Sequence, residues 1–311
     1  MCKELKSKLE NRLIWLNGKI VALPDAQINI LTPASQFGVN VFEGIRCYWN
    51  EQQQQLYAFR LDEHFSRLMN SIKMLKIENK YSIEEMRNAF FDVIKADDYR
   101  ENIAVRQTVF IEGFGSWSSK EPVGMFVAPV PRGLPSKEYN KKGLHCCISS
   151  WRRISDQNLS PRIKCGANYV NSRMAQLEAW DNGYDCAIFL NEQGKVSEGP
   201  GSCLFLVREG KLITPGLSAS ILESITRDTI IRIAKDLNIE VIEREVERTE
   251  LYMCDEAFLC GSAMEITPIY SVDRYKIANE IGVITQKLHE MYLEVVSGNK
   301  KEYLQWLTPI Y

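Results

Sequence analysis

In the first 130 residues, some segments have the hydrophobic pattern of β-strands and others have that of amphipathic helices. This mixture predicts strands and helices in one unit. Apolar stretches flank Asn17-Gly18 within residues 14–22, and this arrangement predicts a β-hairpin with a tight turn. Apolar residues at helical spacing predict an amphipathic helix over residues 61–75. One face of that helix contains Phe65, Leu68, Met69, Ile72 and Leu75.

A second helix and two strands are predicted farther along this unit. Ser82 and Glu85 have the spacing of a capping box, in which each side chain binds a backbone N–H at the start of a helix. Segments rich in β-branched and aromatic residues predict strands over 102–111 and 123–130. We therefore expect a small α+β domain over residues 1–130.

The pattern changes between Pro129 and Gly143, where three prolines, two glycines and several charges occur together. Such composition is typical of an exposed connection, so residues 131–143 are predicted as an interdomain linker. A larger domain is predicted over residues 144–311. Its expected strands cover 144–150, 186–190, 203–207, 240–246 and 256–260, and its expected helices cover 168–180, 226–237 and 284–296. The fold class is α/β in the broad sense, a mixed α+β protein of two domains.

Composition and charge narrow the possible functions. The 38 Lys and Arg residues nearly balance the 40 Asp and Glu residues, so the chain lacks the basic excess of a nucleic-acid-binding protein. We expect no membrane partner either, because no apolar run approaches the length of about 18 residues that a spanning helix needs. The first residues are charged and lack a signal-peptide core, which predicts a cytoplasmic protein.

Cysteine and histidine patterns argue against metal chemistry. The nine cysteines are scattered and form no CxxC motif, and the three histidines lie far apart, with no HExxH motif. We expect no metal site and interpret most cysteines as small buried residues of a reduced protein. The common dinucleotide, P-loop and esterase motifs are also absent from the sequence.

Two residues are candidates for chemistry in the second half. Lys164 precedes three small residues, Cys165-Gly166-Ala167, which would let a flat molecule approach its amine and form a Schiff base. The alternative is an exposed lysine on a loop before a helix. Glu198 precedes Gly199 and Gly201, so it could place a carboxylate beside a closely approached backbone. The alternative is a tight connection with a solvated glutamate.

Two further segments could bind anions. Residues 224–228 begin a predicted helix, whose N-terminal N–H groups can bind a phosphate. The alternative is simple capping by Ser224 or Thr226. Gly261-Ser262-Ala263 follows a predicted strand, and a turn of small residues there offers N–H donors. The alternative is an ordinary strand exit.

Taken together and in this order, these segments resemble the fold-type IV pyridoxal-phosphate enzymes, and most closely the branched-chain amino-acid aminotransferases. The resemblance covers nearly the whole chain and implies the two-domain architecture of the D-amino-acid aminotransferases. It rests on FEGIR at 42–46, Phe59-Arg60 with Glu63-His64, residues 162–169, SEGPG at 197–201, ITRD at 225–228 and GSAMEITP at 261–268.

The resemblance implies a role for individual residues toward pyridoxal 5'-phosphate. Lys164 is implied to bind the cofactor covalently and to carry a proton, Glu198 to face the ring nitrogen, and Tyr169 to bind the phenolic oxygen. The phosphate is implied to be held by Arg60, the N–H groups of Ile225 and Thr226, and the Ser262 hydroxyl.

Substrate contacts are implied in the same way. The N–H groups of Ser262 and Ala263 are implied to receive the substrate carboxylate, and Phe42 and Gly44 to line the pocket. Arg106 is implied to bind the side-chain carboxylate of glutamate, with a strand-edge cation as the alternative.

The sequence departs from the family at three positions. Phe37 and Ala104 stand where family members usually have tyrosine, and Cys203 stands where a polar residue such as asparagine is usual. Phe37 is still expected to line the substrate pocket. The loss of two hydroxyls and one ring should enlarge and dehydrate that pocket.

The predicted function is therefore transfer of an amino group between an amino acid and a 2-oxo acid by a ping-pong mechanism. The resemblance implies a branched-chain or related amino acid, glutamate or 2-oxoglutarate as partner substrate, a place in branched-chain amino-acid biosynthesis, and a homodimer. Three alternatives stay open: a specialised-metabolism transaminase of different specificity, a lyase of the aminodeoxychorismate lyase kind, and a scaffold without turnover.

Overall fold

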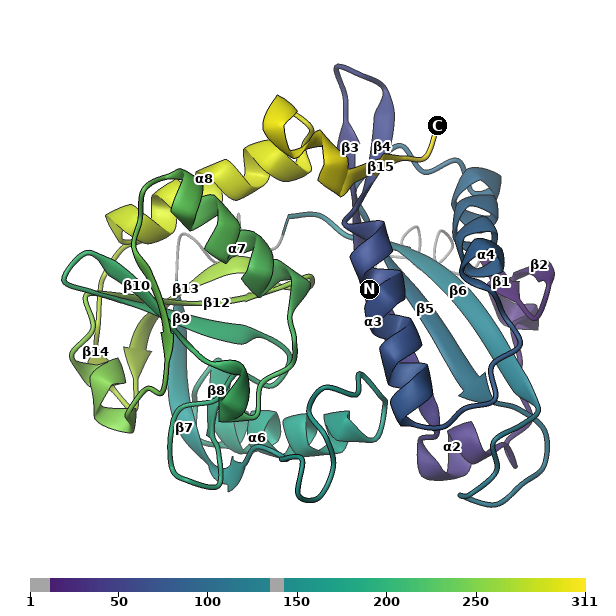
Figure 1. Cartoon of the computed structure of the whole chain (residues 1–311), viewed down its shortest axis with the longest axis horizontal. Coiled ribbons are helices and arrows are strands. Elements are labelled where there is room, and N and C mark those ends of the chain that lie inside the picture. The colour runs from purple at the N-terminus through teal and green to yellow at the C-terminus, as the bar shows by residue number, and fades with distance from the viewer. Residues whose placement is uncertain (1–11, 135–142) are drawn as a thin grey trace. The chain divides into compact units, whose positions relative to one another are not determined.

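The computed structural model describes residues 12–134 and 143–311, which form two compact units (Figure 1). The first unit combines Met1–Gly133, Ile163–Ala167 and Val296–Tyr311, and the second combines Leu134–Arg162 and Asn168–Val295. Two segments of the predicted large domain, 163–167 and 296–311, thus belong to the first unit. Most of the predicted linker, residues 135–142, and nearly all of the charged N-terminal segment lie outside the described residues.

The first unit contains an antiparallel sheet. Its strands, in spatial order, are β15 (Leu307–Pro309), β4 (Gln55–Phe59), β3 (Asn40–Asn50), β5 (Ile103–Ile111), β6 (Val123–Pro131), β1 (Leu13–Leu16) and β2 (Lys19–Ala22). The hairpin predicted over residues 14–22 is confirmed as β1 and β2. Asn17 and Gly18 both have positive φ, 48° and 91°, the geometry that an Asn-Gly turn adopts readily.

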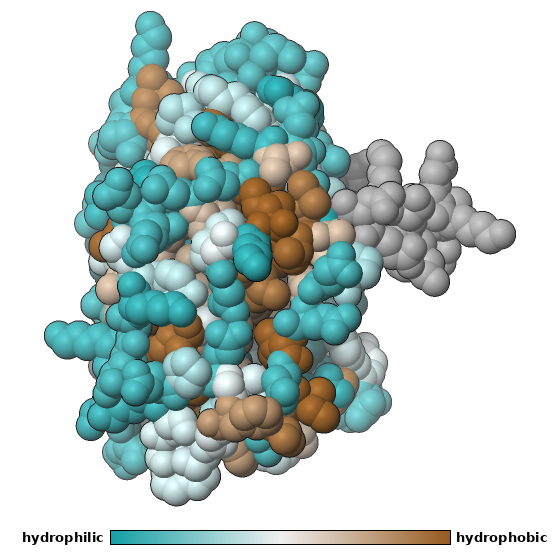
Figure 2. Space-filling view, turned by 90° about the vertical axis from the view of Figure 1, so that its right-hand side faces the viewer, coloured by the Kyte–Doolittle hydropathy of each residue, from teal (hydrophilic) through white to brown (hydrophobic). Residues whose placement is uncertain are grey.

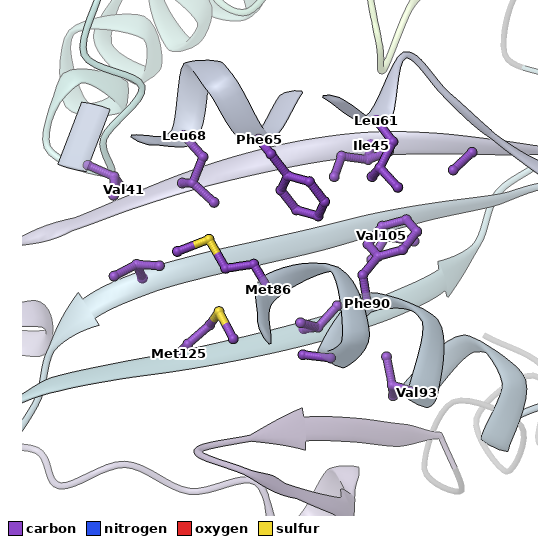
Figure 3. Packing of buried hydrophobic residues seen from close by; sticks show 14 of the residues in the cluster. Val41, Ile45, Leu61, Phe65, Leu68, Met86, Phe90, Val93, Val105 and Met125 are labelled. Atoms are coloured by element: carbon purple, nitrogen blue, oxygen red, sulfur yellow. The ribbon is translucent and has the colours of Figure 1, made fainter. Parts of the chain in front are cut away.

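Helices α3 (Leu61–Met74) and α4 (Ile83–Ala96) cover one face of this sheet (Figure 3). Phe65 of α3 and Phe90 of α4 pack edge to face, with ring centroids 6.3 Å apart. The predicted capping box is confirmed, because Ser82 accepts from the N–H of Glu85 and Glu85 accepts from the N–H of Ser82. A short helix, α2 (Pro33–Phe37), follows η1 (Leu23–Asp25).

Edge pairing explains why two distant segments join the first unit. Strand β4 pairs with β3 only from Cys47 onward, so the edge at residues 40–42 is available. Residues 163–167 take that edge: the Phe42 N–H donates to the Lys164 carbonyl at 2.9 Å, and the Gly166 N–H donates to the Asn40 carbonyl at 3.3 Å. At the C-terminus, β15 pairs with β4 after η4 (Lys301–Trp306).

The second unit contains a mixed sheet. Its path is β11 (Val241–Arg244), β10 (Lys211–Pro215), β9 (Cys203–Arg208), β12 (Glu256–Gly261), β13 (Glu265–Val272), β7 (Leu144–Arg152) and β8 (Cys186–Leu190), with β14 (Tyr275–Lys276) paired to β13. The helices are α6 (Asn168–Asp181), α7 (Ile225–Asp236) and α8 (Val283–Val296), with η2 (Leu217–Ala219) and η3 (Arg248–Tyr252). The strand predicted over 240–246 is shorter than expected because Val246 leaves the edge and enters the core.

The two units confirm the mixed α/β class and the interpretation of the cysteines as packing residues. Eight cysteines of the described part of the chain are buried thiols. Burial raises the pKa of several of them, for example that of Cys147 to about 11. None of the helices in residues 12–134 and 143–311 combines the length and apolarity needed to cross a lipid bilayer.

Candidate active site

Lys164 is held by its backbone at the edge of the first sheet. Its carbonyl accepts from Phe42, and its N–H donates to the hydroxyl of Ser71 on α3 at 3.1 Å. The side-chain ammonium lies 5.1 Å from the centre of the Phe42 ring. Lys164 does lie in the loop before α6, as in the alternative, but β3 and α3 fix this segment and the residue is only partly exposed.

The face of the sheet beside Lys164 carries three of the predicted pocket residues. On the neighbouring strands Gly44 lies opposite Arg106, and Phe42 lies opposite Thr108. All four positions therefore share one face of the sheet. The Arg106 guanidinium lies 4.0 Å from the centre of the Phe42 ring, and a Cβ at Gly44 would meet no atom within 4 Å. Strand β5 lies between β3 and β6, so Arg106 is not the edge cation of the alternative interpretation.

Arg60 begins α3 in the left-handed conformation, with φ of 50°. Its N–H donates to the Trp306 carbonyl at 2.7 Å, its guanidinium lies 4.9 Å from the Trp306 ring, and its Nε donates to Glu63 at 2.8 Å. These contacts hold a buried cation at the start of a helix. Of the three positions that depart from the family, two lie in this unit: Ala104 shares the face of Arg106, and Phe37 ends α2 with its ring about half exposed.

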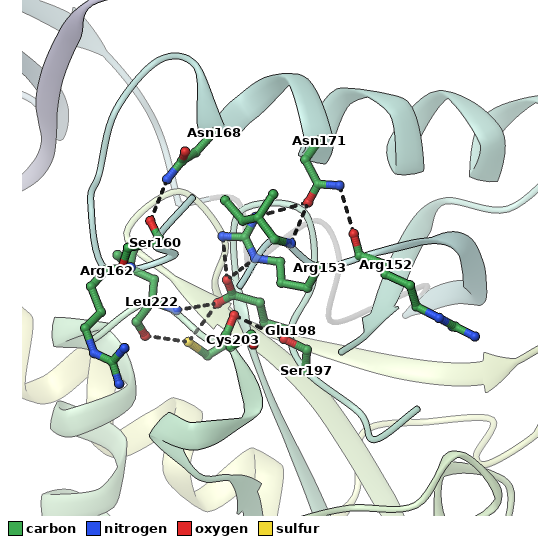
Figure 4. Close-up of polar contacts among 12 residues, drawn as sticks. Arg152, Arg153, Ser160, Arg162, Asn168, Asn171, Ser197, Glu198, Cys203 and Leu222 are labelled. Atoms are coloured by element: carbon green, nitrogen blue, oxygen red, sulfur yellow. Dashed lines mark hydrogen bonds and ion pairs between the residues drawn. The ribbon is translucent and has the colours of Figure 1, made fainter. Parts of the chain in front are cut away.

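In the second unit, Glu198 is a buried carboxylate with several donors (Figure 4). Arg153, which follows β7, donates from Nε at 2.9 Å and from Nη2 at 2.8 Å to the Oε1 atom of Glu198. The Leu222 N–H donates to Oε2 at 3.2 Å, and the Cys203 thiol lies 3.6 Å from the same atom. This ion pair rules out the solvated glutamate of the alternative.

Cys203 lies on β9 beside this carboxylate. Burial, followed by the negative charge of Glu198, raises the pKa of its thiol well above the ordinary value. A protonated thiol can donate to a carboxylate but cannot repel it, so Cys203 is compatible with an ionised Glu198.

Helix α7 begins close to these groups in the same unit. The Ser224 hydroxyl accepts from the Arg227 N–H at 3.2 Å, which confirms the capping alternative. Capping by Ser224 occupies the Arg227 N–H and does not exclude an anion at the start of the helix. Ile225 and Thr226, the first two residues of α7, are buried.

The turn at residues 261–264 joins β12 to β13. A Cβ at Gly261 would lie 3.2 Å from the Gly201 carbonyl, so this turn packs against the segment that follows Glu198. Ser262 is half-buried and Ala263 is exposed there. Tyr169, the second residue of α6, is exposed. The structure thus brings Glu198 and residues 261–263 together in one unit, and Lys164, Phe42 and Arg106 in the other.

The comparisons with known proteins agree over almost the full chain. Residues 40–272 match the family model described as Amino-transferase class IV. The chain belongs to the class IV aminotransferases. It is similar to a probable branched-chain-amino-acid aminotransferase of Aquifex aeolicus, 39% identical over 96% of each chain. The corresponding Escherichia coli enzyme is 34% identical over 96% of this chain and 97% of that protein.

Solved structures of this class share the fold. The branched-chain amino acid aminotransferase of Thermobaculum terrenum in its PLP form is 42% identical, with a TM-score of 0.92 over 97% of this chain and 99% of that chain. The predicted family and fold class are confirmed, and the chain is a pyridoxal-phosphate-dependent aminotransferase. These relatives do not favour the lyase alternative.

The donor groups of the two units fit this cofactor chemically. The first unit supplies an anchored amine at Lys164 and a buried cation at Arg60. The second supplies a buried carboxylate at Glu198 and the N-terminus of α7. Residues 12–134 and 143–311 contain no cluster of three or more His, Cys, Asp or Glu arranged for a metal ion.

Sequence reasoning missed two groups beside the candidate site. Arg153 pairs with Glu198 across 45 positions, and nothing in the local pattern distinguishes it from the neighbouring Arg152. Glu43 and His64 belong to segments that carried the family resemblance, but no role was predicted for either. Both are buried, and each contacts the other.

Proposed function

We propose that this aminotransferase moves the amino group of a branched-chain or related amino acid to a 2-oxo acid, with glutamate and 2-oxoglutarate as the partner pair. The two substrates bind in turn at one site, in a ping-pong cycle. The names of the relatives in Aquifex aeolicus and Escherichia coli support the substrate class. A Thermus relative, 36% identical, was solved with N-(5'-phosphopyridoxyl)-L-glutamate, which supports glutamate as a substrate.

The sheet face at Phe42, Gly44 and Arg106 is the observation that carries this proposal. The Phe42 ring and the open space at Gly44 can contact an apolar substrate side chain. The Arg106 guanidinium can bind a substrate carboxylate. One site that alternates between an apolar and an acidic side chain needs both properties. Ala104 on the same face leaves room where the family usually has a tyrosine, which favours larger side chains.

Pyridoxal 5'-phosphate, when bound, supplies a ring that accepts the electron pair left when the substrate Cα loses its proton. In our proposal the amine of Lys164 holds the cofactor and later carries the proton at Nζ. Glu198, fixed by Arg153, accepts the ring N–H and keeps that nitrogen cationic. Tyr169 donates to the phenolic oxygen.

The remaining contacts bind the charged ends of the ligands. Arg60, the N–H groups of Ile225 and Thr226, and the Ser262 hydroxyl are proposed to hold the phosphate. The N–H groups of Ser262 and Ala263 are proposed to bind the substrate carboxylate, while Phe37, Phe42 and Gly44 line the side-chain pocket.

We also propose a homodimer in the cytoplasm, where the buried thiols remain reduced. Exposed apolar side chains in the first unit support an interface, among them Ile30, Phe114 and Trp117, each more than 70% exposed. Figure 2, seen from the side of β2 and α4 in Figure 1, shows apolar patches among hydrophilic residues. Light scattering should give twice the chain mass of 35.8 kDa, and a mass of one chain would contradict the dimer.

The test of the proposed function is the variant Lys164→Ala. We expect amino transfer from L-leucine to 2-oxoglutarate to fall by at least about 10³-fold, because both cofactor attachment and proton transfer need this amine. Borohydride reduction of the wild-type protein should fix the cofactor on the peptide that contains Lys164. Lys211→Ala, an exposed lysine paired with Glu240, is the control and should keep full activity. Attachment at another lysine, or release of pyruvate from aminodeoxychorismate without a 2-oxo acid acceptor, would overturn the proposal.

A further inference from the structure

Three charged or titratable side chains form a buried network in the first unit. Glu43 shares a strand face with the core residues Val41 and Ile45 and is fully buried. Arg67 of α3 donates from Nε to Oε1 of Glu43 at 2.7 Å and from Nη2 to Oε2 at 2.8 Å. The Nδ1 atom of His64 lies 2.6 Å from Oε2. One carboxylate of β3 is thus bound by two residues from successive turns of α3.

Stability alone does not explain this network. Removing two charges from water costs about as much as their attraction returns, and apolar replacements of such pairs are often equally stable. On the same sheet face Glu43 is flanked by the apolar Val41 and Ile45 and lies opposite the buried amide of Gln107, which carries no charge. A carboxylate in this position therefore suggests a use for its charge.

The protonation states follow from the surroundings of each group. Burial would raise the pKa of Glu43, but the charge of Arg67 and the hydrogen bonds from Arg67 and His64 hold it well below the usual range. Burial lowers the pKa of His64, and the cations Arg67 and Lys164 lower it further, against the opposing effect of Glu43. His64 is accordingly neutral at pH 7 and donates its Nδ1–H to Glu43. The three side chains together carry no net charge.

Both elements of the network also hold Lys164. The Phe42 N–H, adjacent to Glu43 on β3, donates to the Lys164 carbonyl, and Ser71, one turn after Arg67 on α3, accepts from the Lys164 N–H. The Lys164 ammonium and the Arg106 guanidinium of β5 both lie over the Phe42 ring, and the charge of Lys164 acts on His64 of α3.

We propose that Glu43, His64 and Arg67 form a positioning network that fixes the Lys164 segment and balances the charge around its amine. Glu43 compensates the charge of Arg67, so this network adds no net charge beside the Lys164 segment. The inference rests on the proposed function, because it assigns these residues to the same lysine. None of the three is a catalytic residue, since none is assigned a contact with cofactor or substrate.

The test is the pH dependence of two signals in the full-length protein. The first is the absorbance of the lysine-bound cofactor, and the second is labelling of Lys164 by acetic anhydride after removal of the cofactor, measured by mass spectrometry. Glu43→Gln leaves Arg67 uncompensated, so both midpoints should move to lower pH by about 0.5–1 unit. His64→Asn removes a neutral ring and should leave both midpoints in place.

A charge-balanced variant separates electrostatics from packing and protects against misfolding of Glu43→Gln. Glu43→Gln/Arg67→Gln removes both charges, so the midpoints should return to the wild-type values even if stability does not. Asp62→Asn, an exposed residue of α3 paired with Arg87, is the matched control and should change nothing. Equal shifts in the single and double variants, or no shift in either, would overturn the inference. Failure of Lys164 to bind the cofactor in the wild type would overturn the proposed function instead.

Discussion

At the scale of single residues, the environment of Glu198 depends on one arginine. Arg153 directs two N–H groups at one oxygen of the carboxylate, and both side chains are less than a tenth exposed. A buried ion pair of this kind contributes little when both partners are compared with apolar residues, but it is costly to break. Its effect here is to fix the orientation of the Glu198 carboxylate.

The variant Arg153→Met should therefore lose both stability and cofactor. It leaves a buried carboxylate without a counter-ion, so we expect the free energy of unfolding to fall by about 3–5 kcal/mol. Urea unfolding measures the first effect, and the absorbance of bound pyridoxal phosphate at equilibrium measures the second. Arg152→Met is the matched control, because Arg152 is exposed and its side chain points away from Glu198 in Figure 4. Similar losses in both variants would contradict this account.

Candidate site residues could be predicted only where the neighbouring residues in the sequence indicated the chemistry. Lys164 and Glu198 stand beside small residues, and the family resemblance assigned them roles that stay predictions. The partner of Glu198 could not be found in this way, because Arg153 reaches it through the pairing of strands far apart in sequence. The partners of Glu43 are hidden for the same reason, since His64 and Arg67 belong to another element.

At the scale of elements, periodicity predicted those that face the core on one side. Helix α3 and the hairpin β1–β2 were located almost to the residue, and the capping box located the start of α4. Strands β3 and β13 were not predicted, because buried polar residues such as Glu43 and Thr267 interrupt the apolar run that identified the equally buried β8 and β12. A strand buried on both faces lacks the alternation of a half-buried strand, so only such a run identifies it.

Glu250 of η3 leads to a prediction of how the stability of the protein changes at low pH. Hydrogen bonds from the Arg244 guanidinium hold the pKa of Glu250 at about 2, below its ordinary value of 4.5, although burial opposes this. A carboxyl whose pKa is lowered by folding adds stability above its unfolded pKa and loses it as the pH falls through the folded pKa. We expect wild-type stability to exceed that of Glu250→Gln at pH 7, and the difference to shrink between about pH 4.5 and about pH 2.

Chemical unfolding of both proteins at several pH values measures this difference. Glu209→Gln, at an exposed glutamate of the same unit, should unfold like the wild type throughout. A difference that is constant with pH would show that Glu250 acts through packing and not through its charge.

At the scale of the whole molecule, each of the two units is built from segments that are not contiguous in the sequence. The predicted boundaries followed composition, which identifies linkers but not segments that return to an earlier unit. Residues 163–167 join the first unit by hydrogen bonds to a strand edge, and residues 296–311 by strand β15 and the packing around it. Neither contact leaves a signal in hydropathy, because backbone pairing uses groups that every residue has.

The C-terminal segment should therefore control the stability of a unit formed mostly by the N-terminal residues. Ile310 packs in the core of the first unit and is 2% exposed, and the backbone of Tyr311 is bound by the side chain of Gln55. Removing three carbons from such a site costs about 2–5 kcal/mol, so Ile310→Ala should destabilise the first unit. Hydrogen exchange followed by mass spectrometry should show faster exchange in peptides of β3, β4 and α4, with the peptides of β9 and β12 unchanged. Ile83→Ala is the matched control, because Ile83 is 47% exposed, is not one of the residues named for the dimer interface, and should cost little. Faster exchange confined to the second unit would show that the C-terminal segment stabilises that unit instead, and would contradict the assignment of residues 296–311 to the first.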